Sequence, residues 1–358
     1  FGSSESSSVH SDAQHMQNMA QLRVTWIWRS CLVRVVWALF TASPRSSAWR
    51  APDEAPCPVG EVPWPRGGSS YACQAADEAS RDAQSFLYAN MPAWDVLNKG
   101  TLAEGILPPT VNLSLTVRQR FPWAAAVPQD IWQDYVLPYA SVNEARNDWR
   151  QLLTTVLTPF VHNATFQAKG ISEVATILNK HLWSALRPQG AIVFKSEQTP
   201  LIYDPMSTIT FGYASCTGVS ILFVDALRAA GVPARIVGTP AWHGKESDGN
   251  HNWVEIWLGP GQGLAGEDWS FIEAMPAGPG ETLGDPCDKW FCNPQHFDGK
   301  TKAFAAKFRR EPNMTVYPMA WDLANREVPG VDRSEYYNKL CRSCRDGYRI
   351  EAEQLTWN

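Results

Sequence analysis

The sequence SCTGVSILFVDALRAAGVPARIVG, residues 215–238, decides the fold. Apolar side chains in its first half recur at the spacing of an α-helix: Val219, Leu222, Phe223, Ala226 and Leu227. Gly231 and Pro233 end this pattern, because glycine and proline terminate helices. The stretch therefore predicts a buried helix that begins near Cys216, followed by a strand over 234–238.

The predicted helix places Cys216 at its N-terminus. Unpaired backbone N–H groups and the positive end of the helix dipole favour a thiolate at that position. A thiolate attacks carbonyl carbon, so Cys216 is a candidate nucleophile. The alternative is a structural role, because free cysteines are mostly small buried hydrophobic residues.

A histidine and two acidic residues follow on two predicted strands. Residues 249–258 (GNHNWVEIWL) alternate between polar and apolar side chains, and His251 lies near their start. Residues 268–274 (DWSFIEA) form a second short strand with Asp268 at one end and Glu273 near the other. An imidazole can take the proton of a thiol and return it to a leaving group, and a carboxylate orients the ring and stabilises its charge. The alternative for His251 is an ordinary buried hydrogen bond.

These motifs, in this order, resemble the transglutaminase-like branch of the papain-like cysteine enzymes, as in bacterial transglutaminase-domain proteins. The matching sequences are the CTG helix start, LRAAGVPAR, HNWVEIW and WSFIEA, and the resemblance covers about residues 195–275. It implies that Cys216 is the nucleophile and that His251 is its general base. The family's carboxylate lies four residues after a tryptophan, which is Glu273 in this chain.

Two roles depart from the family pattern or stay open. The family has Asp followed by Pro at the carboxylate, whereas this chain has Glu273 followed by alanine, so Asp268 is kept as the alternative. The family often supplies a glutamine or an aromatic donor for the oxyanion. Residues 210–215 contain no glutamine, which leaves Tyr213 and the backbone N–H of Cys216. We also expect Trp253 to contact substrate.

The resemblance implies an α+β fold with a papain-like, transglutaminase-like core, in which a central helix packs on a small antiparallel sheet. We predict a signal-like leader over 1–47, a linker and helical N-terminal region over 48–190, the catalytic core over 191–285, and a cysteine-containing C-terminal extension over 286–358. Within the helical region, residues 172–183 show the clearest helical periodicity.

The leader has the features of a secretory signal peptide. Arg23, Arg29 and Arg34 supply positive charge, and an apolar run over 35–42 precedes a cleavage point between residues 42 and 48. An amphipathic N-terminal helix or a membrane anchor is the alternative. We expect a protein that is secreted, or held in the secretory pathway or at the cell surface, with no stable membrane span after signal removal.

The cysteines agree with an oxidising compartment. The chain has 8 cysteines. Setting aside Cys31 in the leader and Cys216 leaves an even number, which suits three disulfides whose pairing stays open. A zinc site built from C-x4-C and C-x2-C is the alternative. The disulfide candidates are Cys57, Cys73, Cys287, Cys292, Cys341 and Cys344.

Composition limits the class of partner. The chain has 358 residues, 44% hydrophobic and 19% charged, which is ordinary for a globular protein. A net charge of −5 and the lack of a basic stripe argue against nucleic-acid binding. The sequence has no glycine-rich phosphate motif and no calcium-loop spacing, so no cofactor or metal is expected. The expected partner is a protein or peptide substrate.

The predicted reaction is acyl transfer through a thioester. Cys216 attacks a peptide or glutamine carboxamide, His251 protonates the departing amine, and water or a second amine resolves the intermediate. The two outcomes correspond to a cysteine peptidase or amidase, which is a hydrolase, and to a protein-glutamine transferase. From a different class, the alternative is a catalytically inactive binding or scaffold protein with the same fold.

Overall fold

The computed structural model describes residues 61–65, 71–161, 170–280 and 282–344, which belong to a unit spanning Cys57–Asn358. The predicted leader lies outside the described residues, as do Cys57 and the side chain of Cys73. Among the described residues, no helix is both long enough and apolar enough to cross a membrane.

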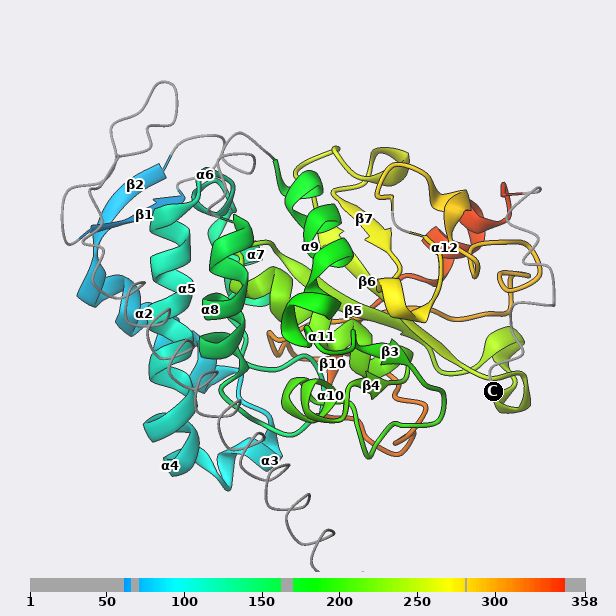
Figure 1. Ribbon diagram of the computed structural model, residues 1–358, viewed down its shortest axis with the longest axis horizontal. Helices are drawn as coiled ribbons and strands as arrows, with labels where there is room; N and C mark the ends of the chain where they lie inside the picture. Colours follow the sequence, from blue (N-terminus) through cyan, green and yellow to red (C-terminus); the bar gives the residue numbers. More distant parts are fainter. Residues whose placement is uncertain (1–60, 66–70, 162–169, 281, 345–358) are drawn as a thin grey trace, which may run out of the picture. The chain divides into compact units, whose positions relative to one another are not determined.

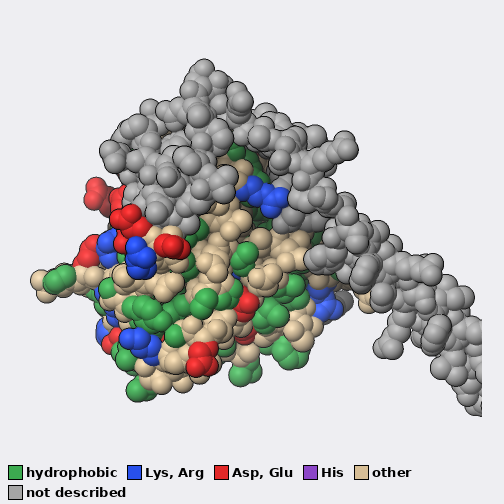
Figure 2. Space-filling model, turned by 90° about the vertical axis from the view of Figure 1, so that its left-hand side faces the viewer, with side chains coloured by type: hydrophobic (Ala, Val, Ile, Leu, Met, Phe, Trp, Pro, Cys, Tyr) green, Lys and Arg blue, Asp and Glu red, His purple; other side chains and the backbone are tan. Residues whose placement is uncertain are grey.

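The N-terminal part of the described chain is a small hairpin followed by helices. The hairpin strands β1 (Glu61–Pro65) and β2 (Tyr71–Ala75) pair antiparallel. The helices that follow are α2 (Ala76–Ala89), α3 (Ala93–Val96), α4 (Lys99–Thr101), the π-helical turn η1 (Leu102–Ile106), α5 (Leu107–Arg120), α6 (Pro122–Ala125), α7 (Gln129–Tyr135), α8 (Trp149–Val161) and α9 (Ile171–Leu186). Seen from the side on which α2 and α5 lie, the described surface mixes basic and acidic side chains with apolar ones (Figure 2).

The sequence explains where these helices begin and end and which face they bury. Helix α5 has prolines in its first turn, where their missing N–H costs nothing, and it ends before Pro122. Helix α9 contains the predicted helical segment 172–183. Its side chains at 174, 178 and 182 are buried at four-residue spacing, so one face of the helix packs on the core.

The predicted central helix is α11 (Cys216–Ala229), and it is buried along its whole length. It begins at Cys216 and ends just before Gly231, whose φ of 75° lies in the left-handed region that favours glycine. Two short strands, β3 (Val193–Phe194) and β4 (Tyr213–Ala214), pair in parallel just before it. Helix α10 (Pro205–Phe211) leads into β4. Helices α8, α9 and α11 lie beside one another (Figure 1).

An antiparallel six-stranded sheet carries this helix, in the order β7-β6-β5-β8-β10-β9. Its strands are β5 (Ala234–Thr239), β6 (His251–Trp257), β7 (Trp269–Ile272), β8 (Phe304–Ala306), β9 (Thr315–Val316) and β10 (Pro329–Asp332). Short 3-10 turns connect them: η3 (Trp242–Gly244), η4 (Glu246–Asp248), η5 (Leu264–Gly266), η6 (Met275–Ala277) and η7 (Pro286–Asp288). Helix α12 (Ser334–Cys341) follows the last strand. The predicted α+β fold with a helix on an antiparallel sheet is thus confirmed.

The two faces of the sheet pack against different partners. Even-numbered residues of β5, β6 and β7, such as Ile236, Val254 and Ile272, pack in the cluster that contains α11. Odd-numbered neighbours such as Trp253 and Phe271 pack with Tyr337 of α12 on the other face. Successive side chains of a strand point to opposite faces, so this alternation buries the central strands on both sides.

The C-terminal segment is part of the same sheet. Strands β8, β9 and β10 come from it and extend the sheet beyond β5. Two disulfides, Cys287–Cys344 and Cys292–Cys341, join the turn after β7 to the end of α12. These bonds run between the two cysteine clusters, and they use the four sulfurs that the alternative zinc site would have needed.

We expect the Cys292–Cys341 disulfide to stabilise the fold. It closes a loop with a sequence separation of 49 residues and both of its cysteines are fully buried. Replacing both cysteines by serine should lower the free energy of unfolding by about 2–4 kcal/mol, because the unfolded chain gains loop entropy. Guanidinium denaturation at pH 7 measures the loss. Wild-type protein in excess dithiothreitol should lose at least as much free energy of unfolding. An unchanged midpoint of guanidinium denaturation in the double variant would contradict the expectation.

Candidate active site

Cys216 occupies the first position of α11, with Ser215 as the residue before the helix. The residue is 9% exposed, and among the described residues it is the one free cysteine. The backbone N–H of Asn252, the second residue of β6, donates to the thiol sulfur. The helix start therefore presents the sulfur to the first residues of the neighbouring strand.

His251 is the first residue of β6 and is 3% exposed. Its Nε2 lies 2.8 Å from Oε2 of Glu273. The imidazole also interacts with the thiol of Cys216 through a hydrogen bond and through its charge. The ring therefore bridges the sulfur and the carboxylate, as a general base between a nucleophile and its orienting group does.

Glu273 follows directly after β7 and is fully buried. Its Oε2 accepts a second hydrogen bond, from the indole N–H of Trp290 at 3.1 Å. Asn179 of α9 holds the backbone at and just after this position, because its Nδ2 donates to the Glu273 carbonyl at 2.8 Å and its Oδ1 accepts from the N–H of Met275 at 2.9 Å. Strand, helix and C-terminal segment thus all fix the carboxylate.

Electrostatics in the buried site favour a charged sulfur. Burial opposes ionisation of the Cys216 thiol, but the hydrogen bond and charge of His251 together hold its pKa below the usual value. Burial alone would lower the pKa of His251, yet the charge of Glu273 and the bonds to both partners raise it to about 10. Burial raises the pKa of Glu273 above its usual range, and His251 and Trp290 oppose that rise.

The first turn of α11 is joined to β6 by a buried polar network. The Asn252 side chain donates from Nδ2 to Oγ1 of Thr217 at 2.9 Å. Its Oδ1 accepts from the hydroxyl of Tyr317 at 2.6 Å, and Tyr317 follows β9. A fully satisfied buried network makes an arrangement rigid, so these bonds hold the residues next to Cys216 and His251 in register.

The other residues suggested by the sequence lie elsewhere. Asp268 is exposed, and its Oδ1 accepts from the N–H of Gly261 at 2.9 Å. The ring of Tyr213 is half-buried, with the Lys195 ammonium 4.5 Å from its centre. Trp253 is fully buried in the core, and its indole N–H donates to the Tyr337 hydroxyl at 2.8 Å. The structure thus brings Glu273, and not Asp268, to the histidine, and Trp253 packs in the core.

Sequence reasoning missed three residues that support this site. Asn179 and Trp290 lie far from the motifs along the chain, and nothing in the sequence marks either of them as a contact of Glu273. Asn252 lies within the HNWVEIW motif, directly after the histidine, so the sequence could have predicted its position beside the site. The sequence could not have predicted its side-chain bond to Thr217, because that bond depends on how helix and strand pack.

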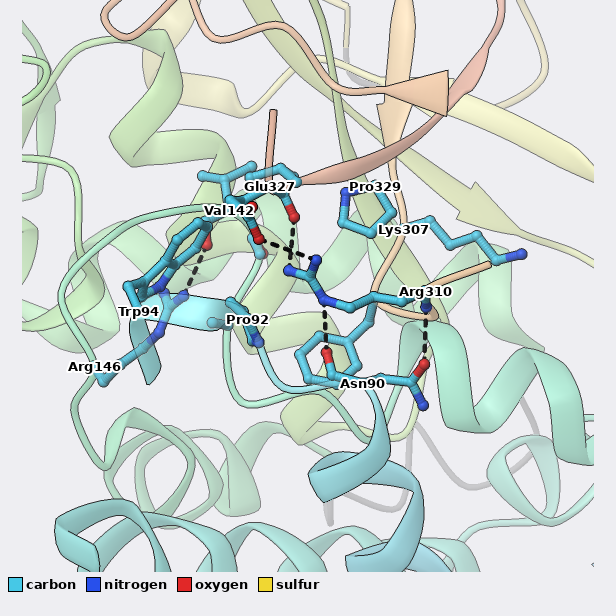
Figure 3. A pocket seen from close by; sticks show the side chains of 13 residues that line it. Asn90, Pro92, Trp94, Val142, Arg146, Lys307, Arg310, Glu327 and Pro329 are labelled. Atoms are coloured by element: carbon cyan, nitrogen blue, oxygen red, sulfur yellow. Dashed lines mark hydrogen bonds and ion pairs between the residues drawn. The ribbon is translucent and has the colours of Figure 1, made fainter. Parts of the chain in front are cut away.

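A small pocket lies away from these residues, between the N-terminal helices and the C-terminal strands (Figure 3). Its lining includes Trp94, Arg146 and Arg310. Arg310 donates to the carbonyl of Glu327 at 2.6 Å, and Arg146 pairs with Asp95 at 3.0 Å. Because both guanidinium groups already have partners within the protein, we assign no ligand to this pocket.

The pKa of His251 should depend on the charge of Glu273. Replacing Glu273→Gln keeps the shape of the side chain but removes the charge, so burial is then opposed mainly by Cys216 and the pKa of His251 should fall well below about 10. An NMR titration of the His251 imidazole measures the change. The matched control is Asp268→Asn, which removes an exposed charge and should leave the titration in place. Equal effects of the two variants would contradict this geometry.

The comparison with protein-family models agrees with the fold. Residues 158–274 match the family model described as the transglutaminase-like superfamily. No curated protein matches the chain. A crystal structure from Cytophaga hutchinsonii, described provisionally as a cysteine protease, is similar at 14% sequence identity and a TM-score of 0.26, over 54% of this chain and 66% of that one. The stretch that matches the transglutaminase-like superfamily therefore includes Cys216, His251 and Glu273.

Proposed function

We propose that this protein is a cysteine-dependent enzyme that transfers an acyl group from a peptide or glutamine carboxamide through a thioester. The observation that carries the proposal is the convergence of three buried groups at the start of α11. His251 lies between the Cys216 thiol and the Glu273 carboxylate, and the pKa of the thiol is lowered although it is buried. A buried cysteine with a purely structural role has its pKa raised instead.

Each group has a defined part in the reaction. The thiolate of Cys216 attacks the carbonyl carbon, and a tetrahedral intermediate forms. His251, as the imidazolium, gives its proton to the departing amine or ammonia, and the C–N bond breaks to leave a thioester. The neutral imidazole then takes a proton from water or from a second amine, which attacks the thioester and releases the sulfur. Glu273 keeps the ring in one orientation and stabilises its charged form.

The nature of the second nucleophile separates two activities. Water gives a peptidase or amidase, and an amine gives a protein-glutamine transferase. The same first half-reaction serves both, so the acyl-enzyme is common to them. The disulfides Cys287–Cys344 and Cys292–Cys341 support an oxidising compartment, and we place the enzyme outside the cell or in the secretory pathway.

A binding or scaffold role is the second candidate, and the burial of the site favours it. Cys216 is 9% exposed and His251 is 3% exposed. A substrate must reach the sulfur through this narrow exposure, whereas a binding protein has no such requirement. The thiol's reactivity distinguishes the two candidates, because a scaffold does not need a thiolate.

We expect Cys216 to be alkylated by iodoacetamide at a pH where ordinary thiols are protonated. The rate, followed by mass spectrometry of the peptide that contains Cys216, should rise at a midpoint below the ordinary thiol value of about 8.5. His251→Ala should return the midpoint toward the ordinary range, because it removes the group that lowers the pKa. His181→Ala, on the exposed face of α9, is the histidine control. A midpoint of an ordinary thiol in the wild type would favour the scaffold role.

Product analysis should then identify the reaction. Glutamine-containing peptides are incubated with the enzyme, with and without an added alkylamine, and the products are identified by mass. Cleavage or deamidation marks hydrolysis, and amine incorporation marks transfer. Cys216→Ala should lose the activity by at least a thousandfold, because it removes the nucleophile. Equal product formation by this variant would reject the proposed mechanism.

A further inference from the structure

Trp290 donates to the same carboxylate oxygen that His251 uses. Its Nε1 lies 3.1 Å from Oε2 of Glu273, and Nε2 of His251 lies 2.8 Å from that oxygen. The rings of Trp290 and His251 also contact each other, with their centres 4.7 Å apart and a tilt of 60°. An indole N–H is a donor only and does not titrate. It therefore holds this oxygen at every pH at which the protein is folded.

The indole fits closely into its surroundings. Gly278 faces it with φ at 138°, and a Cβ at that position would lie 2.9 Å from Cδ1 of Trp290. The next residue, Phe291, stacks on Trp253 with ring centres 4.7 Å apart, and its own ring lies 5.1 Å from that of His251. The imidazole is thus enclosed by aromatic rings that leave it little freedom to rotate.

The segment that carries Trp290 is anchored at both ends. Cys287 and Cys292 flank it, and their disulfides connect it to Cys344 and Cys341 near the end of α12. Between them, the buried Lys289 ammonium donates to the Asp285 carbonyl at 2.6 Å. The segment lies outside residues 158–274, which match the superfamily. The C-terminal part of the chain therefore reaches the catalytic carboxylate through one side chain.

We propose that Trp290 is a positioning residue for the Glu273–His251 pair, held in place by the disulfide-anchored segment 287–292. The inference rests on the proposed function, since it assigns Trp290 a role in the same site. Without the indole donor, the buried carboxylate keeps one fewer hydrogen bond to its charged form. Its pKa then rises, because hydrogen bonding to a carboxylate favours ionisation and burial opposes it. A protonated Glu273 no longer stabilises the imidazolium, and the thiolate of Cys216 loses its partner.

The test compares Trp290→Phe with Trp253→Phe. Each variant removes one indole N–H from the same aromatic cluster and leaves a ring, but the Trp253 donor goes to Tyr337 instead of Glu273. The rate of Cys216 alkylation rises with pH, and we call the rising part of this profile its acid limb. In Trp290→Phe the acid limb should move to higher pH by about one unit, and kcat should fall about tenfold with KM little changed. Trp253→Phe should leave the acid limb where it is. If Trp290 only stabilised the fold, Trp290→Phe would lower the alkylation rate at every pH without moving the acid limb.

A second variant covers the case in which Trp290→Phe does not fold. Replacing Cys287 and Cys344 by serine keeps the indole and releases one of its two anchors, so the acid limb should move in the same direction by a smaller amount. An unmoved acid limb in the variants that fold would overturn the role of Trp290. An ordinary thiol titration in the wild type would instead overturn the proposed function, so the two failures are distinguishable.

Discussion

The contact between the first turn of α11 and the start of β6 determines whether the sulfur meets the imidazole. Helix α11 is buried on every side, so its position along its own axis is fixed by core packing rather than by the site. Thr217 and Ser220 then bond to Asn252, at 2.9 Å and 3.2 Å. A shift of the helix by a fraction of a turn would break these bonds and separate Cys216 from His251. Precise alignment of reacting groups is worth large factors in rate, so rigid packing and chemistry are linked here.

The other end of the same helix is held by the N-terminal helices. Arg228, in the last turn of α11, donates to the carbonyls of Tyr135 at 3.2 Å and Ala140 at 3.0 Å. Arg150 of α8 donates to the carbonyl of Arg228 at 3.1 Å, and burial lowers the pKa of Arg150 to about 9. Carbonyls that would otherwise be unpaired in the interior thus receive charged donors. The N-terminal helical region thus holds the C-terminal end of α11, and Cys216 lies at its opposite end.

The sequence was informative where local chemistry decides the structure. The period of apolar residues and Gly231 were enough to place the central helix, and the order of the motifs was enough to bring Cys216 and His251 together, with the carboxylate left open between Glu273 and Asp268. Local patterns do not specify contacts between distant segments. Three features depend on tertiary packing and have no periodic or motif signal in the sequence. They are the path of residues 304–332 into the sheet, the pairing of Cys287 with Cys344, and the contact between Trp290 and Glu273. Choosing Glu273 over Asp268 required the direction in which each side chain points.

The strand order has a consequence for synthesis of the chain. Strand β5 pairs on one side with β6, which follows it closely, but on the other side with β8, which begins at Phe304. While the ribosome makes the intervening residues, the backbone N–H and C=O groups on that side of β5 have no strand to pair with. Open strand edges recruit other chains, so this nascent protein is exposed to aggregation until its last third has emerged. A chaperone that covers this edge during synthesis would protect the chain at its most vulnerable stage.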